Sequence, residues 1–174
     1  MPPFDKNGRY DPACSKEMID WMIAQGATGF YLTGSNGQGP FMDSSERMEV
    51  VETMTGQVAG RVPVVAHIGA VSARHSAEMA RHASCSGCTG VSAVPSYYVK
   101  LNLQEMKDYY REIAEASDVP LVIYSQPHIN PSVELFQTLA QIPNIKGLKF
   151  TGPDHYMMGR IKAHLGPDFM VYSG

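Results

Sequence analysis

The chain has 174 residues, a net charge of −3 and 44% hydrophobic residues. That length and apolar content suit one core, so we expect residues 1–174 to form a single domain. No cluster of Lys and Arg indicates a nucleic-acid partner. The sequence shows neither an apolar run as long as a membrane span nor the apolar segment of a signal peptide. These features predict a cytoplasmic protein without a membrane partner.

Helix and strand patterns alternate along the chain. The first helix begins at Asp11 and Pro12 and ends at Gly26, since a cap residue followed by Pro and a closing Gly is typical of helix ends. Its expected apolar face consists of Met18, Trp21, Met22 and Ile23. Capping-box patterns at Asp43 and Asn102 begin two later helices. Three more helices are expected near residues 72–85, 132–141 and 154–164.

Six apolar runs between these helices predict strands. They cover residues 29–33, 62–68, 90–94, 120–124, 145–150 and 169–172. Because the runs lack alternation, they indicate strands buried on both faces, and hence a parallel sheet. An open doubly wound sheet and a (β/α)8 barrel both fit this pattern. Residues 34–39 do not match the dinucleotide-binding G-x-G-x-x-G pattern, whereas a complete barrel typically needs ~250 residues.

Lys149 is the most informative residue. It lies in the apolar run of residues 145–150, directly before Thr151. Burial beside an apolar core disfavours the charged ammonium, and a neutral amine is the nucleophile that forms a Schiff base with a ketone. A lysine at a strand end that extends its head group to water is the alternative interpretation.

Further polar residues are predicted at the same ends of the strands, where parallel α/β folds place their active sites. Ser35 and Asn36 follow the first strand and are uncharged donors suited to holding an anion. Tyr124 ends the fourth strand and is suited to relaying protons. His67 and Ser92 end the second and third strands. Taken singly, the tyrosine also fits a packing role and the loop a simple turn.

Six segments in order carry a resemblance to a known family. They are residues 29–39, 45–47, 67–72, 91–98, 123–127 and 147–151, within a match from about Phe4 to Gly174. In these segments the chain resembles the pyruvate-dependent class I aldolases, the superfamily of N-acetylneuraminate lyase and dihydrodipicolinate synthase. The resemblance implies a (β/α)8 TIM barrel that is incomplete here, with about strands two to seven and their helices.

The resemblance also implies roles for individual residues. Lys149 matches the Schiff-base lysine and Tyr124 the proton-shuttling tyrosine, while Ser35 and Asn36 match the pair that grips the pyruvate carboxylate. The positions that match contacts to a sugar acid, or a tyrosine near a neighbouring subunit's site, are Thr151, Gly174 and Tyr98. The implied partners are pyruvate and a sugar-derived aldehyde or 2-keto acid. The implied assembly is a homo-oligomer, a tetramer in the family, and no cofactor beyond the lysine imine is implied.

Departures from the family pattern leave three functions open. Asn36 replaces the usual Thr, Gln38 the usual Glu, and Ser125 with Gln126 an Asn and an apolar residue. Residues 128–130 contain no arginine of the kind that synthases use for a dicarboxylic substrate, which favours the lyase branch. The alternatives are a dihydrodipicolinate synthase-like condensation and an inactive barrel fragment that needs a partner chain.

Two smaller patterns have ordinary explanations. Cys85 and Cys88 form a C-x-x-C, which is compatible with a redox pair or half a zinc site but follows a helix rather than beginning one. We favour a helix end at which Gly87 is the left-handed cap. His75 and His82 lie two turns apart on the expected third helix, which favours a solvated helix face over a metal site.

Overall fold

The computed structural model describes residues 1–174, apart from the side chain of His128. Within the described residues, all strands belong to one parallel sheet in the order β1-β2-β3-β4-β5-β6. The strands are β1 (Phe30–Leu32), β2 (Val64–His67), β3 (Gly90–Ala93), β4 (Leu121–Ser125), β5 (Ile145–Phe150) and β6 (Met170–Ser173). The predicted runs therefore all contain strands.

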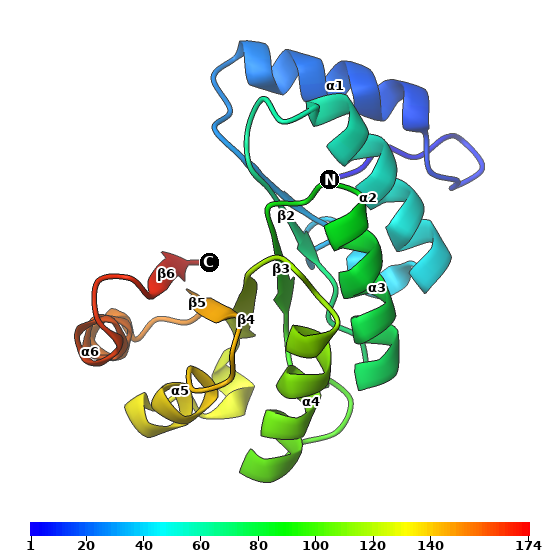
Figure 1. Ribbon diagram of the computed structural model, residues 1–174. Coiled ribbons are helices and arrows are strands. Elements are labelled where there is room, and N and C mark those ends of the chain that lie inside the picture. Colours follow the sequence, from blue (N-terminus) through cyan, green and yellow to red (C-terminus); the bar gives the residue numbers. More distant parts are fainter.

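The helices lie on the outer side of the curved sheet (Figure 1). They are α1 (Pro12–Ala24), α2 (Ser44–Val58), α3 (Ala73–Cys85), α4 (Leu103–Glu115), α5 (Val133–Leu139) and α6 (His155–Leu165). Two short 3-10 turns, η1 (Gly39–Phe41) and η2 (Pro127–Ile129), follow β1 and β4. Both predicted capping boxes are present, at Asp43 with Glu46 and at Asn102 with Glu105. Each satisfies backbone donors at a helix start and thereby fixes where the helix begins.

Alternate residues of each strand face the helices. Leu32, Val91, Ile123 and Leu148 are buried in this outer core, together with fully buried Phe136 and Ile161 from α5 and α6. The other set of positions faces the concave inner side of the sheet, because successive side chains of a strand point to opposite faces. The inner set includes Tyr31, Tyr124 and Lys149. The sheet therefore separates a packed hydrophobic core from an inner face that carries Lys149 and the two tyrosines.

The expected apolar face of α1 is wrong at Trp21, whose side chain is 64% exposed. The helix is buried at Ser15 and Ile19 instead, one turn apart, while Met18 and Ile23 pack at the margin of the core. Asp20 accepts a hydrogen bond from Gln57 of α2 at 2.7 Å, which fixes this rotation of the helix. Trp21, one residue further round the helix, consequently faces outward.

The register between β4 and β5 shifts by one residue near the start of the two strands. Leu121 pairs with Ile145 and the next residue, Val122, pairs with Gly147, so Lys146 has no partner on β4. After the shift, Tyr124 pairs with Lys149, and Lys149 pairs with Tyr172 of β6. An extra residue of this kind is left unpaired and bends the strand locally, and the regular pairing after it places Lys149 beside Tyr124.

The predicted fold class is confirmed. Six parallel strands with helices on the outer side form an incomplete TIM barrel of the α/β class, with β1 and β6 at the two edges. Strands of a parallel barrel are tilted and staggered around a common axis, so their carboxyl ends converge on one side. The loops that follow β1, β4 and β5 meet at that side, together with Gly174 at the end of β6.

Candidate active site

Lys149 lies close to two tyrosine rings on the inner face. Its Nζ atom is 3.7 Å from the centre of the Tyr124 ring and 5.1 Å from the centre of the Tyr31 ring. Both distances are within the range of a cation–π interaction with an ammonium group. Tyr124 belongs to the neighbouring strand, whereas Tyr31 comes from β1 across the concave face. The structure thus brings the two predicted catalytic residues together and adds a third aromatic residue.

Tyr124 is buried, and only 6% of it is exposed. Burial by itself raises the pKa of its phenol. Hydrogen bonding with Gln126 and Lys149, the Lys149 charge and a contact with Ser35 outweigh that effect, so the pKa of Tyr124 lies below its ordinary value. A phenol with a lowered pKa gives up and takes back a proton more readily near neutral pH.

The loop after β1 is held tightly at its base. Thr33 has a φ of 52°, which is unusual for a β-branched residue, and its hydroxyl donates to the His67 carbonyl at 2.8 Å. A Cβ atom on Gly39 would lie 1.8 Å from the Thr33 carbonyl oxygen, so the loop closes on itself with no room for a side chain there. Ser35 and Asn36 are exposed at its tip. Backbone strain of this kind is retained where the surrounding contacts hold it, frequently at functional sites.

Thr151 and Gly174 lie beside the Lys149 side chain. A Cβ atom built on Gly174 would lie 2.4 Å from the Thr151 hydroxyl oxygen and 2.8 Å from Lys149 Cε. The Gly174 amide donates to the Phe150 carbonyl at 2.8 Å, and the Thr151 amide donates to the Ser125 carbonyl at 3.0 Å. The Thr151 hydroxyl is buried without a hydrogen-bond partner among the described residues. Its predicted contact with a bound molecule stays a prediction.

Tyr98 stands apart from this group. It is 85% exposed in the segment between β3 and α4, and its neighbour Tyr97 is 48% exposed. The chain by itself gives Tyr98 no place beside Lys149, so its predicted role near a neighbouring subunit's site stays a prediction.

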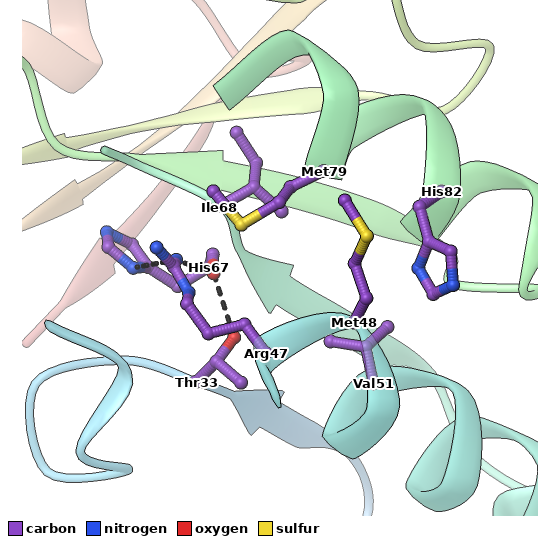
Figure 2. A pocket seen from close by; sticks show the side chains of 8 residues that line it. All are labelled: Thr33, Arg47, Met48, Val51, His67, Ile68, Met79 and His82. Carbon is purple, nitrogen blue, oxygen red and sulfur yellow. Dashed lines mark hydrogen bonds between the residues drawn. The ribbon is translucent and has the colours of Figure 1, made fainter. Parts of the chain in front are cut away.

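Arg47 and Tyr31 were missed by the sequence analysis. Arg47 is a buried guanidinium on α2 that donates to the Gly69 carbonyl at 2.9 Å and to the His67 carbonyl (Figure 2). Burial and the Arg47 charge lower the pKa of His67 to about 3, so this histidine is neutral. The cavity beside Arg47 measures about 10 Å³, room for a single water at most. Arg47 therefore supports the loops and does not line a substrate site.

The larger hollow lies on the inner face, with a volume of about 360 Å³. Its walls are mainly apolar, and Lys149 is its charged group. The lining residues are Gly29, Phe30, Tyr31, Pro63, Val65, Val122, Lys149, Tyr172 and Ser173. Among the described residues, no group of three His, Cys, Asp or Glu side chains is placed to hold a metal ion.

Cys85 and Cys88 are free thiols in the structure. α3 ends at Cys85 and Gly87 has a φ of 89°, as expected for a left-handed helix end. Cys88 is buried with its sulfur 3.5 Å from the Thr55 hydroxyl, and burial raises the pKa of its thiol. A buried thiol with a raised pKa is a weak nucleophile, so Cys88 is not suited to redox or nucleophilic chemistry. No helix of the described residues has the length and apolar character to cross a membrane.

The fold is a parallel (β/α) barrel sheet, and a lysine with tyrosines close to it lies near the carboxyl end of one strand. Together these two features define a class of barrel protein. The chain matches the Dihydrodipicolinate synthetase family over residues 1–174, and it belongs to that family. It is 33% identical to an N-acetylneuraminate lyase of Escherichia coli (strain SMS-3-5 / SECEC) over 178 residues. This alignment covers 100% of the chain and 60% of the relative.

Two solved structures show the same fold. CdNal from Clostridium difficile, in complex with mannosamine, superposes with a TM-score of 0.95 at 28% identity. The chloride-inhibited dihydrodipicolinate synthase from Acinetobacter baumannii, complexed with pyruvate, superposes with a TM-score of 0.93 at 28% identity. In both cases the match covers 100% of this chain and 61% of the other. The chain thus spans about 60% of the length of the relatives it matches.

Proposed function

We propose that this chain carries the Schiff-base site of a class I aldolase or lyase that cleaves or forms a carbon–carbon bond with pyruvate. The observation that carries the proposal is the Lys149 amine held against the Tyr124 ring, 3.7 Å from its centre. The neutral amine attacks the ketone carbon of pyruvate to give a carbinolamine. Protonation of the carbinolamine hydroxyl by Tyr124 lets it leave as water, and the C=N bond forms.

We assign the binding of the pyruvate carboxylate to the loop after β1. Ser35 and Asn36 are exposed there and carry uncharged donors suited to the carboxylate. A contact between Ser35 and the Tyr124 phenol puts that end of the site within reach of the reacting carbon. The family relative from Acinetobacter baumannii, solved with pyruvate, supports this choice of keto acid.

The second half of the substrate is proposed to be a sugar-derived aldehyde, within a sialic acid or a related 2-keto sugar acid. Thr151 and Gly174, which lie beside the Lys149 side chain, are the residues proposed to contact that part of the substrate. The lyase relatives and the mannosamine complex of CdNal support a sugar portion. A dihydrodipicolinate synthase-like condensation is the second candidate, supported by the synthase named among the structural neighbours.

The proposed chemistry uses the lysine imine and no separate cofactor. A homo-oligomer, a tetramer by family resemblance, is part of the proposal, with exposed Tyr98 directed at a neighbouring copy. An inactive fragment that needs a partner chain is the alternative, and the unpaired edges of β1 and β6 favour it. Size-exclusion chromatography combined with a pyruvate-release assay distinguishes the active enzyme from the inactive fragment. Turnover by this chain alone, eluting as one defined species, would reject the fragment interpretation.

Borohydride reduction in the presence of pyruvate tests the Schiff base directly. Peptide mass mapping is expected to find the reduced pyruvate adduct on Lys149 and none in Lys149→Arg. Lys146→Arg is a matched control, because Lys146 lies three residues away on the same strand but is exposed. Unmodified Lys149 in folded protein would reject the proposed function.

A further inference from the structure

We infer that Tyr31 is a positioning residue of this site, whose ring forms the second wall of an aromatic slot that holds the Lys149 side chain opposite Tyr124. The inference deepens the proposed function, and its kinetic consequence rests on that function. The placement of the ring itself does not depend on it. None of the roles assigned above from the family resemblance falls on Tyr31.

The two walls of the slot come from strands that are not neighbours. Tyr124 lies on β4, next to the lysine strand, whereas β1 is at the far edge of the sheet. The Tyr31 ring nevertheless lies 5.1 Å from Lys149 Nζ, because the sheet curves, while the Tyr124 ring lies 3.7 Å from the same atom. The amine is therefore in contact range of rings from two strands that are not neighbours.

The Tyr31 ring is itself fixed by contacts at both ends. Its hydroxyl donates to the Ser92 hydroxyl of β3 at 3.0 Å. A Cβ atom on Gly34 would lie 2.7 Å from Tyr31 Cε1, so the ring packs directly against the backbone at the start of the Ser35 loop. Tyr31 consequently connects the amine, the third strand and the loop proposed to bind the carboxylate.

The two tyrosines differ in the state of their hydroxyls. Tyr31 is 38% exposed as a whole, but desolvation around its hydroxyl raises the pKa of the phenol, which keeps it protonated and donating to Ser92. The pKa of Tyr124 is lowered instead. Opposite environments of this kind separate a group that moves protons from one that stays fixed. Tyr31 therefore fits a supporting role, while Tyr124 keeps the proton transfer.

Confinement matters because a lysine side chain is long and flexible. Fixing its rotamers costs conformational entropy, and a slot formed before substrate binds meets that cost in advance. Attack on a bound ketone also requires the amine to lie close to the carbon and in line with it. Removal of one wall should slow imine formation more than it weakens pyruvate binding.

The first measurement uses protein labelled with 13C at the lysine ε-carbons, so that each lysine gives one NMR signal. The Lys149 signal, identified by its loss in Lys149→Arg, is expected upfield of the others because the rings shield it. Tyr31→Leu should move it toward the exposed lysines, and Tyr31→Phe should not. A Lys149 signal that Tyr31→Leu leaves unmoved would overturn the inference, and this readout needs no pyruvate.

The second measurement is the rate of reducible adduct formation as a function of pyruvate concentration. Tyr31→Leu should lower the limiting rate roughly 10-fold with a nearly unchanged half-saturating concentration, as expected for lost positioning. Tyr31→Phe should retain most of the rate. Ser92→Ala should match Tyr31→Phe, and the double variant should add nothing, because both remove the same hydrogen bond.

These outcomes separate the inference from the proposed function. No adduct in the parent protein would reject the Schiff base, while the NMR shift would still decide whether Tyr31 confines Lys149. An adduct that forms in Tyr31→Leu at the parental rate would overturn the positioning role. If Tyr31→Leu does not fold, Tyr31→Phe and Ser92→Ala decide the matter: strictly additive rate losses would show that their hydrogen bond does not act as one unit.

Discussion

Lys149 and Tyr124 are paired residues on adjacent parallel strands, and the lysine amine lies 3.7 Å from the centre of the tyrosine ring. The pairing holds both side chains on the concave face through the backbone hydrogen bonds of the sheet. Their contact is therefore set by strand register and does not depend on a mobile loop. In the proposed mechanism, the acid or base and the nucleophile would therefore both be in place before substrate binds.

Replacement of Tyr124 by Phe is expected to preserve the fold and the pyruvate adduct on Lys149, while slowing turnover by ~100-fold or more. The ring that packs against the amine remains, and only the proton-carrying oxygen is lost. Lys149→Arg should abolish the adduct, because a guanidinium stays protonated. Adduct yield and steady-state rate are measured on each variant. Parental turnover by Tyr124→Phe would return Tyr124 to a packing role.

Gly174→Ala is expected to displace the Lys149 side chain. The new methyl group would lie 2.8 Å from Lys149 Cε and 2.4 Å from the Thr151 hydroxyl oxygen, well inside contact distance. Adduct yield should fall sharply while the far-ultraviolet circular dichroism spectrum is unchanged. Gly56→Ala is the control, since nothing lies within 4 Å of its added Cβ. Normal trapping by Gly174→Ala would show that the backbone around Gly174 yields.

Gln126→Leu is expected to raise the pKa of Tyr124, because hydrogen bonding from Gln126 is one of the effects that lower it. The pH dependence of adduct formation should contain a limb that Tyr124→Phe removes. In Gln126→Leu that limb should move to higher pH. Gln104→Leu, a change on exposed α4, should leave it in place. A limb that does not move in Gln126→Leu contradicts the assignment.

The free energy of unfolding should decrease as the pH is lowered, because the buried His67 is neutral in the folded protein. Its pKa is lowered from 6.5 to about 3 by burial and the Arg47 charge, so the unfolded chain binds a proton that the folded chain does not. This group does not reduce the free energy of unfolding above pH 6.5. As the pH falls from 6.5 toward 3, the free energy of unfolding decreases by about 1.4 kcal/mol per pH unit. Urea unfolding at several pH values measures the slope. His67→Gln should flatten it, and exposed His75→Gln should not.

Arg47→Lys is expected to destabilise the protein by about 2 kcal/mol, although it preserves the charge. The guanidinium donates to carbonyls of both Gly69 and His67, and a single ammonium cannot reproduce that fork. Denaturant titration gives the free energy of unfolding. Arg74→Lys, at an exposed pair with Glu78, should change stability by less than about 0.5 kcal/mol. Equal effects of both changes would argue against a supporting role for Arg47.

Most of the fold followed from local signals in the sequence. The capping boxes at Asp43 and Asn102 act through neighbouring atoms only, so they mark the same helix starts in the structure. The strands were predictable because a run of apolar residues without alternation fits a strand that is buried on both faces of a parallel sheet. Trp21 was misplaced because several faces of α1 are apolar, and contacts with α2 decide which one is buried.

The contacts between residues near the ends of neighbouring strands could be predicted from the sequence. The contacts that depend on the curvature of the sheet could not. Lys149 and Tyr124 end neighbouring strands, so their contact follows from topology. Tyr31 lies in the middle of a three-residue strand and reaches the lysine because the sheet bends β1 back toward β5. A tyrosine at an inward-facing position of an apolar run is a weak signal for this. The role of Arg47 could not be predicted from the sequence, since the hydrogen-bond acceptors of its guanidinium are backbone carbonyls.

The unpaired Lys146 makes the start of β5 tolerant of a change in length. Removal of that single residue would restore an unbroken ladder between β4 and β5 and would leave every later pair as it is, Tyr124 with Lys149 included. A one-residue deletion at Leu148 would instead move Lys149 opposite Ile123, where its amine would face the helices. The two deletions lie two residues apart on one strand, yet only the second would separate the amine from its tyrosine.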